Sequence, residues 1–481
     1  MKRFDVWELF TISALFFTLL AGSFAKATTL QEYLEEVKKE NIGYEANETQ
    51  SEAAALKSRE ADLLFAPRFF ANARIGHDGK EPFGSTFEYD RLNLQNYSLG
   101  ISQDFNFGLQ TKLSYALDRT EIEGATLPAG VGNSFWTATP TLELSLPLWA
   151  NGFGRTSRAN QELSRQQNVA EKFAAEAQTK TLLVEAEAAY WKLVSSQQVV
   201  EVQTRAQTQA QNILDYVSRK ARMNLGDNAD VLQAKAMVEA TTYQLQLAKN
   251  QEKAARRNFN TYIHKNAEEP VAKLEGFNFE SLNNVTVPTQ RPGNRSDVLA
   301  AEAQSKLAQA SAKVVAERNK PNLDLYGSYA FNGRDEELNE AMKNAGQPEK
   351  DTAFVGVRLN IPLNFSATSA TKAGTLKAEK AAQLTYEQKK FLQEQDWNNL
   401  VQQLSEAKEN LKLATNIVNA QKAKLENERT RLKQGRTTTY QVLLFEQDFS
   451  QSEVNRVQAA SLILGLNSQI KLYQASLEGG N

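Results

Sequence analysis

The sequence predicts a mainly α-helical chain that also supplies strands to a membrane β-barrel and is internally duplicated. Three observations lead to this prediction. Aromatic-rich stretches alternate apolar and polar side chains with a period of two residues, as membrane-barrel strands do. Residues 155–222 and 375–432 contain neither proline nor glycine and have the composition of long helices. The order of helix, strands, long helix, turn and returning helix occurs twice along the chain.

The N-terminal segment reads as a secretory signal peptide over residues 1–27. It has a basic start at Lys2 and Arg3, a short apolar run over 9–20, and an A-x-A site that ends at Ala27. A membrane anchor is the alternative, but Thr11 and Ser13 interrupt the run, which is also short for a span. We therefore expect a protein that is exported from the cytoplasm.

Composition excludes several classes of function. The 481 residues contain no cysteine and two histidines, which excludes disulfides, thiolate metal sites, a lipidated cysteine and a histidine metal cluster. The mean hydropathy of −0.51 excludes a multi-span helical membrane protein, and a net charge of −2 gives no reason to expect nucleic acid as a partner. The sequence contains no phosphate-binding loop. His77 has no nucleophile beside it, and the place of His264 near a helix end explains that residue without catalysis. We therefore expect no enzyme activity, no cofactor and no metal.

Two regions are predicted to form strands. Residues 28–64 are expected to form a helix, residues 65–148 the strands of the first half, and residues 321–364 those of the second half. In the run 97–117 the odd positions are apolar and the even positions are polar or small, with few exceptions. A soluble sandwich with one buried face has the same period and remains the alternative, but the density of aromatic residues favours the barrel.

The first strand region is longer than the second. Pro67 and Pro147 are 80 residues apart, whereas Pro321 and Pro362 are 41 apart. The second region suits one hairpin with a loop around 333–350. For the first we expect an additional hairpin, with strands at about 66–77, 94–105, 109–119 and 138–148 and a tight turn at Gly108. The competing interpretation is two strands with a long outer loop.

Long helical hairpins are predicted over residues 149–265 and 365–478. Between them lie a connector over 266–293 and a helix over 294–320 that opens the second half. Leucine or valine recurs every seven residues, which predicts packing against neighbouring helices of similar length, whereas a solvated helix is the alternative. The series comprises Leu404, Leu411, Val418, Leu425 and Leu432, with Ala407 and Ala414 between them; shorter series are Val231, Val238 and Leu245, and Ile463, Ile470 and Leu477.

Paired motifs support the duplication. Pro67 and Pro321 open the strand regions, and Pro147 and Pro362 close them. The long helices end at Leu225-Gly226 and at Gln434-Gly435, each with an arginine four residues before the glycine. We expect both glycines to stop the helix in the left-handed conformation, which glycine adopts at little cost.

In this order of elements the chain resembles the TolC-like outer-membrane efflux proteins over nearly all of its mature length. The resemblance rests on the paired proline motifs, on the segment 294–302, and on the turns Leu225–Leu232 and Gly435–Leu443. It implies a homotrimer with an α-helical periplasmic tunnel continuous with an outer-membrane β-barrel in lipid. It also implies an exit duct that works with a periplasmic adaptor (membrane fusion) protein and an inner-membrane transporter, for drug efflux, metal efflux or type I secretion of proteins. Because the sequence has no nucleotide-binding motif, we expect transport through the duct to be passive.

The resemblance also implies a site at the periplasmic end. The adaptor-docking tips would be Leu225, Gly226, Gln434 and Gly435. An acidic gate would involve Asp230, with Asp227 as a substitute and Gln441 at the position where an acid is usual, and the arginines that could pair with these acids are Arg222, Arg431 and Arg436. The interval from Gly226 to Asp230 is two residues shorter than that from Gly435 to Gln441.

A second class of function remains open. An exported coiled-coil structural protein or adhesin without channel activity would explain the signal peptide and the seven-residue periodicity. It would not explain the paired strand regions or the duplication.

Overall fold

The computed structural model describes residues 28–80, 89–125 and 132–474 and divides the chain into two units. One unit contains the residues up to Thr49, Ala175–Ser296 and those from Leu392 onward; the other contains Gln50–Ala174 and Asp297–Phe391. The predicted signal peptide and Leu477 lie outside the described residues.

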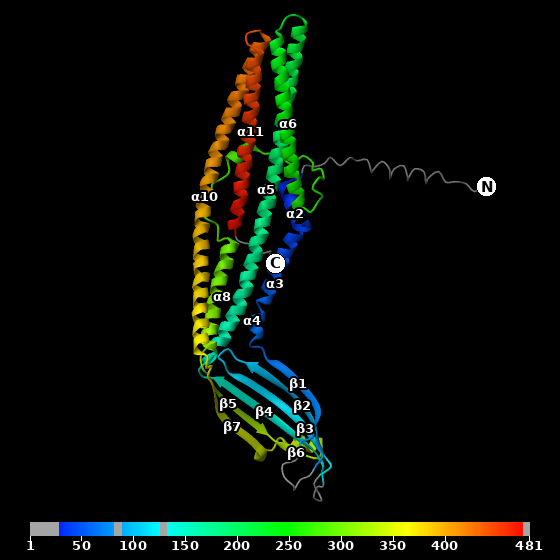
Figure 1. The fold of residues 1–481 in the computed structure, drawn as a ribbon, viewed down its shortest axis with the longest axis vertical. Helices are drawn as coiled ribbons and strands as arrows, with labels where there is room; N and C mark the ends of the chain where they lie inside the picture. Colours follow the sequence, from blue (N-terminus) through cyan, green and yellow to red (C-terminus); the bar gives the residue numbers. More distant parts are fainter. Residues whose placement is uncertain (1–27, 81–88, 126–131, 475–481) are drawn as a thin grey trace, which may run out of the picture. The chain divides into compact units, whose positions relative to one another are not determined.

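One antiparallel sheet dominates the second unit (Figure 1). Its long strands run in the order β1-β2-β3-β4-β5-β7, and the short β6 pairs with β4. Their bounds are β1 Arg68–Asp78, β2 Arg91–Asp104, β3 Gln110–Glu123, β4 Ser134–Pro147, β5 Asn322–Phe331, β6 Gly333–Asp335 and β7 Asp351–Asn360. The pairing of β4 with β5 joins strands from the two halves of the sequence.

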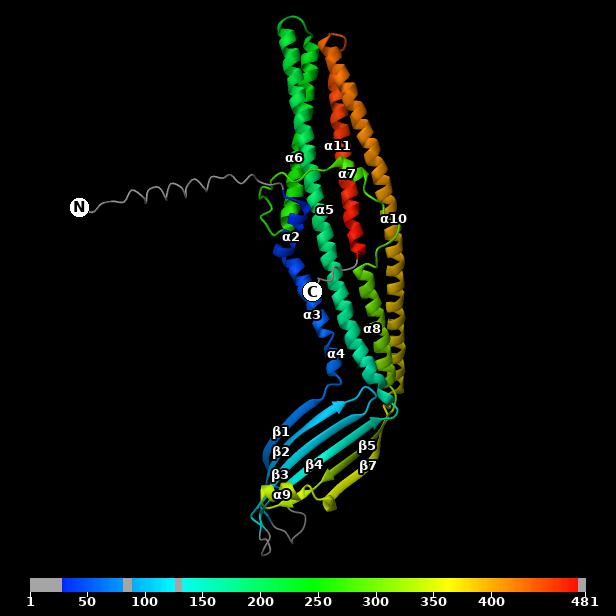
Figure 2. The ribbon, with the colours of Figure 1, turned by 180° about the vertical axis from the view of Figure 1, so that it is seen from behind.

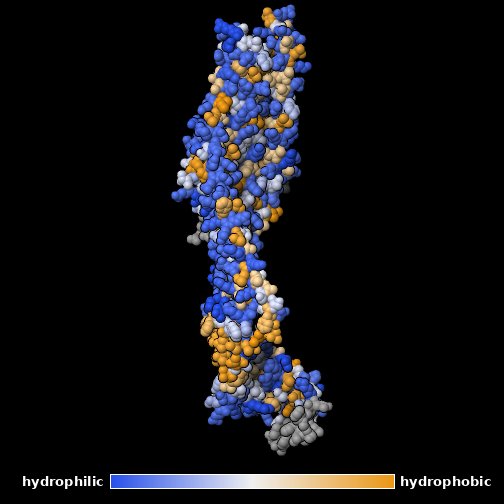
Figure 3. Space-filling model, turned by 60° about the vertical axis from the view of Figure 1, so that its left-hand side comes forward, coloured by the Kyte–Doolittle hydropathy of each residue, from blue (hydrophilic) through white to orange (hydrophobic). Residues whose placement is uncertain are grey.

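The register gives the sheet one apolar face. Because side chains alternate along each strand, residues that lie opposite each other share a face, and the apolar positions of all six long strands fall together. They include Phe69 and Ile75 on β1, Leu99 and Ile101 on β2, Leu113 and Leu117 on β3, Leu142 and Leu144 on β4, Leu325 and Tyr329 on β5, and Val355, Val357 and Leu359 on β7. Figure 3 shows hydrophobic residues gathered in a band over this sheet.

The opposite face of the sheet is polar. Arg68 pairs with Asp104 at 2.6 Å, and Lys112 pairs with Glu143 at 2.7 Å. Tight alternation in the sequence therefore produced two chemically different faces, as predicted.

The sheet is not closed. Among the described residues β1 pairs only with β2, and β7 pairs only with β5. A single chain therefore does not form the barrel, and both edge strands expose unpaired main-chain groups.

The additional hairpin is confirmed, because the described residues of the first half form four strands. The Phe105 N–H donates to the Leu109 carbonyl at 2.8 Å, and Gly108 has a φ of 93°, so the tight turn falls where it was predicted. The loop of the second half has a structure that was not predicted. It contains β6, helix α9 (Leu338–Asn344) and a 3₁₀ turn, η3 (Pro348–Lys350), and α9 packs so closely that no Cβ fits at Gly333.

The N-terminal helix is broken into three pieces, α2 (Leu30–Glu40), α3 (Ile42–Lys57) and α4 (Glu60–Leu63), where one helix was expected. Asn41 causes the first break. Its backbone is extended, its side-chain amide donates to the Tyr262 carbonyl at 2.8 Å, and its side-chain oxygen accepts from the Tyr44 N–H at 3.0 Å. A tertiary contact here outweighs local helix propensity.

Two long helical hairpins complete the chain. They are α5 (Arg155–Arg222), which follows the 3₁₀ turn η2 (Gly152–Gly154), with α6 (Asn228–Tyr262), and α10 (Phe365–Lys433) with α11 (Thr439–Ile470). Between them lie α7 (Phe279–Asn283) and α8 (Ser296–Arg318), and the 3₁₀ turn η4 (Lys471–Tyr473) follows α11. Figures 1 and 2 show the members of each hairpin side by side. No helix within the described ranges is both long and apolar enough to cross a membrane.

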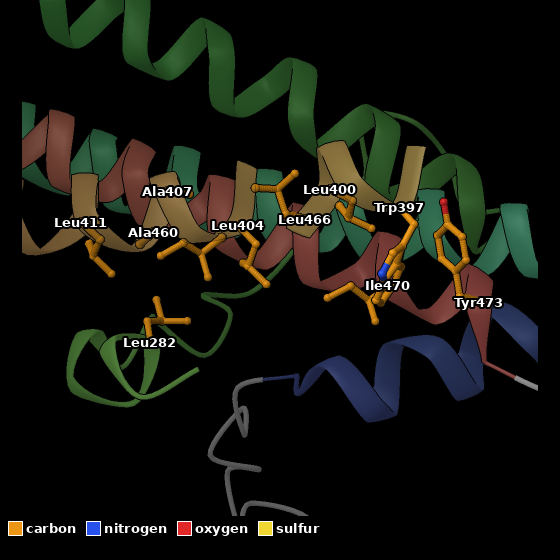
Figure 4. Packing of buried hydrophobic residues seen from close by; sticks show 11 residues of the cluster. Leu282, Trp397, Leu400, Leu404, Ala407, Leu411, Ala460, Leu466, Ile470 and Tyr473 are labelled. Carbon is orange, nitrogen blue, oxygen red and sulfur yellow. The ribbon is translucent and has the colours of Figure 1, made fainter. Parts of the chain in front are cut away.

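The seven-residue periodicity marks the buried face of α10. Leu404, Leu411, Val418 and Leu425 are all buried, with Ala407 between the first two. Leu404, Ala407 and Leu411 belong to one buried cluster with side chains of α11 and α7, part of which Figure 4 shows. The solvated-helix alternative is therefore wrong for this face of α10.

Candidate gate and helix-turn tips

Each long hairpin turns at a tip with the same backbone geometry. At the first tip the Leu225 N–H donates to the Lys220 carbonyl at 2.9 Å, and the Asn224 N–H donates to the Ala221 carbonyl at 3.0 Å. At the second tip the Arg436 N–H donates to the Arg431 carbonyl at 2.9 Å, and the Gly435 N–H donates to the Leu432 carbonyl at 3.0 Å. Both patterns are Schellman motifs, which satisfy the last carbonyls of a helix.

The two tips therefore align Asn224 with Gly435. These two residues have φ values of 56° and 70°, whereas Gly226 is not left-handed. The prediction that Gly226 stops the first helix is wrong, and the prediction for Gly435 is confirmed. Asparagine tolerates the left-handed conformation better than most residues, and so the first tip does not need glycine at this point.

This alignment removes the apparent difference of two residues between the tips. Asp227 caps α6, accepting from the Ala229 N–H at 3.0 Å, and Thr438 caps α11, accepting from the Gln441 N–H at 3.3 Å. Each cap follows its left-handed residue by three. Asp230 and Gln441 consequently occupy the same position, the third residue of the returning helix, and both are half-buried.

The predicted arginines do not pair with these acids within the chain. Arg431 pairs with Glu428 at 3.1 Å and donates to the Arg436 carbonyl, and Arg222 donates to the Ser218 carbonyl at 3.3 Å. No ion pair joins Asp227 or Asp230 to any of the three arginines in the part of the chain that the structure describes. Asp230 and Asp227 lie in the first turn and at the cap of α6, where the helix dipole stabilises negative charge.

Charged pairs hold the second hairpin near its tip. Arg429 on α10 donates to Glu446 on α11 at 2.7 Å, and Lys424 on α10 pairs with Asp448 on α11 at 3.0 Å. Burial raises the pKa of the Glu446 carboxyl, although the Arg429 guanidinium acts in the opposite direction.

Glu428 adds a further buried charge to the second hairpin. Its carboxylate accepts from Arg431 and from the Thr437 hydroxyl, which bridges the turn. The second hairpin is thus fastened by side-chain charges on both sides of the tip.

The first hairpin is held by apolar contacts instead. Val217 on α5 and Ala234 on α6 form a small buried cluster with Leu443 of α11. Counting back from the aligned residues Asn224 and Gly435, Val217 is the counterpart of Glu428, and both are buried. The tips thus share a backbone but differ in what stabilises them.

Sequence reasoning missed this charged network, although one signal for it exists. The alanines between the heptad leucines, Ala407 and Ala414, are followed at the same interval by Gln421 and Glu428. Polar residues at the buried positions of a seven-residue repeat mark a buried polar site. The pairs between α10 and α11 carry no such signal, because their spacing depends on where the hairpin turns.

The predicted docking residues lie on the surface of the tips. Leu225 and Gln434 are exposed, as are Gly226 and Gly435. No group of His, Cys, Asp and Glu able to hold a metal ion occurs among the described residues. The tips can therefore present charge and apolar surface to ions or to a protein partner.

The fold is that of outer-membrane channels. No family model and no curated protein matches the sequence. The outer-membrane channel OprN is 19% identical, with a TM-score of 0.62 over 93% of this chain and 90% of that chain. The Campylobacter jejuni CmeC outer-membrane channel is 13% identical, with a TM-score of 0.60 over 93% and 87%. The Neisseria gonorrhoeae MtrE outer-membrane channel in its open state is 16% identical, with a TM-score of 0.59 over 92% and 88%. The resemblance to the TolC-like proteins is thereby confirmed at the level of the fold.

Proposed function

We propose that this chain is the outer-membrane exit duct of a tripartite efflux or type I secretion assembly, and that it conducts its substrate passively. The observation that carries the proposal is the open sheet with one apolar face and two free edges, in a chain with the fold of outer-membrane channels. Free strand edges are not tolerated in lipid. Assembly of three copies into one barrel removes them and turns the apolar face toward the membrane.

The helical hairpins extend this duct into the periplasm. Their tips form the entrance, and the exposed residues around Leu225 and Gln434 dock the adaptor, which connects the duct to an inner-membrane transporter. The helical unit alone would also suit an exported coiled-coil protein, but that function leaves the apolar face of the sheet without a purpose.

Membrane fractionation separates these two functions. The expressed protein is expected in the Sarkosyl-resistant outer-membrane fraction, and the purified protein is expected to give stepwise conductance in planar bilayers. A protein found in the soluble periplasmic fraction, or one that is folded and oligomeric but never conducts, would overturn the exit-duct proposal.

The acidic gate is tested at the aligned positions. Asp230→Asn is expected to lower cation selectivity and weaken block by divalent cations, because it removes one acid per copy from the entrance. Gln441→Asp is expected to do the opposite. Asp215→Asn on α5 is the matched control, since Asp215 is also an acid near the first tip but precedes the turn. Unchanged selectivity in both tip variants would remove Asp230 from the gate.

A further inference from the structure

The pairing of β4 with β5 is the joint between the two halves of the chain. It connects the last strand of the first half to the first strand of the second half, with Leu142 opposite Tyr329 and Ser145 opposite Tyr326. Pairing continues past the end of β4, since the Leu148 N–H donates to the Leu323 carbonyl of β5 at 2.7 Å.

The strands at the two free edges, β7 and β1, correspond to β4 and β5 in the duplication. β7 is the last strand of the second half, as β4 is of the first, and β1 is the first strand of the first half, as β5 is of the second. Pro362 corresponds to Pro147, and Pro67 corresponds to Pro321. β1 and β5 both begin at the residue after that proline.

We propose that β7 of one copy pairs with β1 of a second copy in the register of the β4–β5 joint. The inference rests on the proposed barrel and specifies how its copies meet. To transfer the register, positions on β4 are counted from Pro147 and those on β7 from Pro362, and likewise from Pro321 on β5 and Pro67 on β1. This places Asn360 opposite Asn72, Val357 opposite Ile75, and Leu359 opposite Ala73.

The main-chain hydrogen bonds support this register. The Asn332 N–H donates to the Lys350 carbonyl. The main-chain N–H and C=O groups of even-numbered residues of β7 therefore point toward β5, and those of odd-numbered residues point toward the free edge. In the β2–β3 hairpin the Phe105 N–H donates to the Leu109 carbonyl. The main-chain groups of odd-numbered residues of β2 therefore point toward β3, and those of even-numbered residues point toward β1. Even residues of β1 therefore face β2, which leaves the odd ones at the free edge. The proposed register brings odd residues of both edges together, as hydrogen bonding requires.

The apolar face continues across the proposed joint. Val357 and Ile75 both belong to the apolar face, as do Leu359 and Ala73. A shift of one residue would put every side chain of one strand on the wrong face. On this face, Val355 and Ile75 at the two edges are 76% and 72% exposed in the single chain, compared with 41% for Leu144 in the middle of the sheet.

On the polar face the register places Arg358 opposite Arg74. The Arg358 guanidinium already lies over the Tyr326 ring, 4.8 Å from its centroid, on the side of β5. Both side chains point to the polar face, which would line the water-filled interior, and water and salt screen their repulsion.

The joint also sets the size of the barrel. The described residues of each chain form six strands of ten residues or more, so three copies joined in this way give eighteen. Barrels of sixteen to eighteen strands enclose an aqueous channel. The additional hairpin of the first half is thus the element that widens the pore.

Disulfide trapping tests the register, and the natural chain contains no cysteine that could interfere. Asn72→Cys with Asn360→Cys is the test pair. The Cα atoms of a non-hydrogen-bonded antiparallel pair are about 4.5 Å apart, which is within the range that a disulfide spans. Oxidation in outer membranes is expected to convert most of the monomer into covalent dimer and trimer on non-reducing gels. Thr141→Cys with Ala330→Cys is the control within one chain, since these residues face each other on β4 and β5.

Asn360→Cys combined with Phe70→Cys or with Arg74→Cys reports a register shifted by two residues. Stronger trapping in either shifted pair would overturn the register while leaving the trimeric channel intact. Trapping in none of the three pairs, when the control closes, would show that β7 and β1 do not meet. Conductance of the unmodified protein is measured separately, so failure of the channel function is distinguishable from failure of the joint.

Discussion

At the scale of single residues, one equivalent position distinguishes the two tips. Val217 and Glu428 are both buried at the same distance from their turns, but only Glu428 requires partners, which Arg431 and Thr437 supply. A buried carboxylate that loses its partner is costly. The second tip is therefore the more sensitive of the two to the loss of a single side chain.

The Arg429–Glu446 pair gives a prediction of this kind. Arg429→Ala is expected to weaken the second hairpin by about 1–3 kcal/mol, because it leaves the Glu446 carboxylate half-buried without its donor. Faster amide hydrogen exchange at the start of α11 would report the loss. Exchange that is unchanged by Arg429→Ala would contradict the role of the pair.

The pH dependence of the same residue has a definite sign. Burial raises the pKa of Glu446 above its ordinary value of 4.5, so the folded state binds this proton more tightly than the unfolded chain does. The contribution of Glu446 to stability is complete at pH values below the ordinary pKa of the unfolded chain. It is lost as the pH rises through the higher pKa of the folded state. Glu446→Gln is expected to abolish this component of the pH dependence of exchange in α11, whereas Glu453→Gln, on the same helix, is the control.

At the scale of elements, periodicity predicted most of what the structure contains. Alternation over 97–117 predicted the strands and their apolar face, and Gly108 predicted the turn that divides the run. The break at Asn41 and the α9 loop were not predictable, because each depends on a residue distant in sequence: Tyr262 in one case and the β4 strand in the other. The charged ties between α10 and α11 escaped prediction for the same reason.

The heptad positions of α10 differ sharply in their predicted effect on stability. Leu411 is fully buried, whereas Leu413 on the same helix is 51% exposed. Leu411→Ala is expected to lower the free energy of unfolding by about 2–5 kcal/mol, and Leu413→Ala by far less. Denaturant titration of both purified variants gives the comparison, and equal losses would show that the period does not mark the core.

At the scale of the whole molecule, the two faces of the sheet define what surrounds it. Adjacent residues of β3 point to opposite faces, with Leu113 on the apolar one and Ser114 on the polar one. This arrangement separates an apolar surface from a polar one within a single strand, as the proposed barrel in lipid requires.

Arginine substitutions at these two residues test that separation. Leu113→Arg is expected to cost about 2–4 kcal/mol for a position deep in the bilayer and to reduce the amount of protein in the outer membrane. Ser114→Arg is expected to leave that amount unchanged. The measurement is the yield of heat-modifiable protein in purified outer membranes, and equal yields would contradict a lipid-facing apolar side.

The unequal tips have a consequence for stoichiometry. In the proposed trimer, three copies would present two tips each, and the two tips of a chain share a backbone geometry but not the side chains that stabilise them. A ring of partner subunits that contacts every tip must therefore bind at two non-equivalent kinds of site. Titration of such a partner onto the assembled duct would then resolve two affinity classes of equal number, even though every subunit on each side has the same sequence.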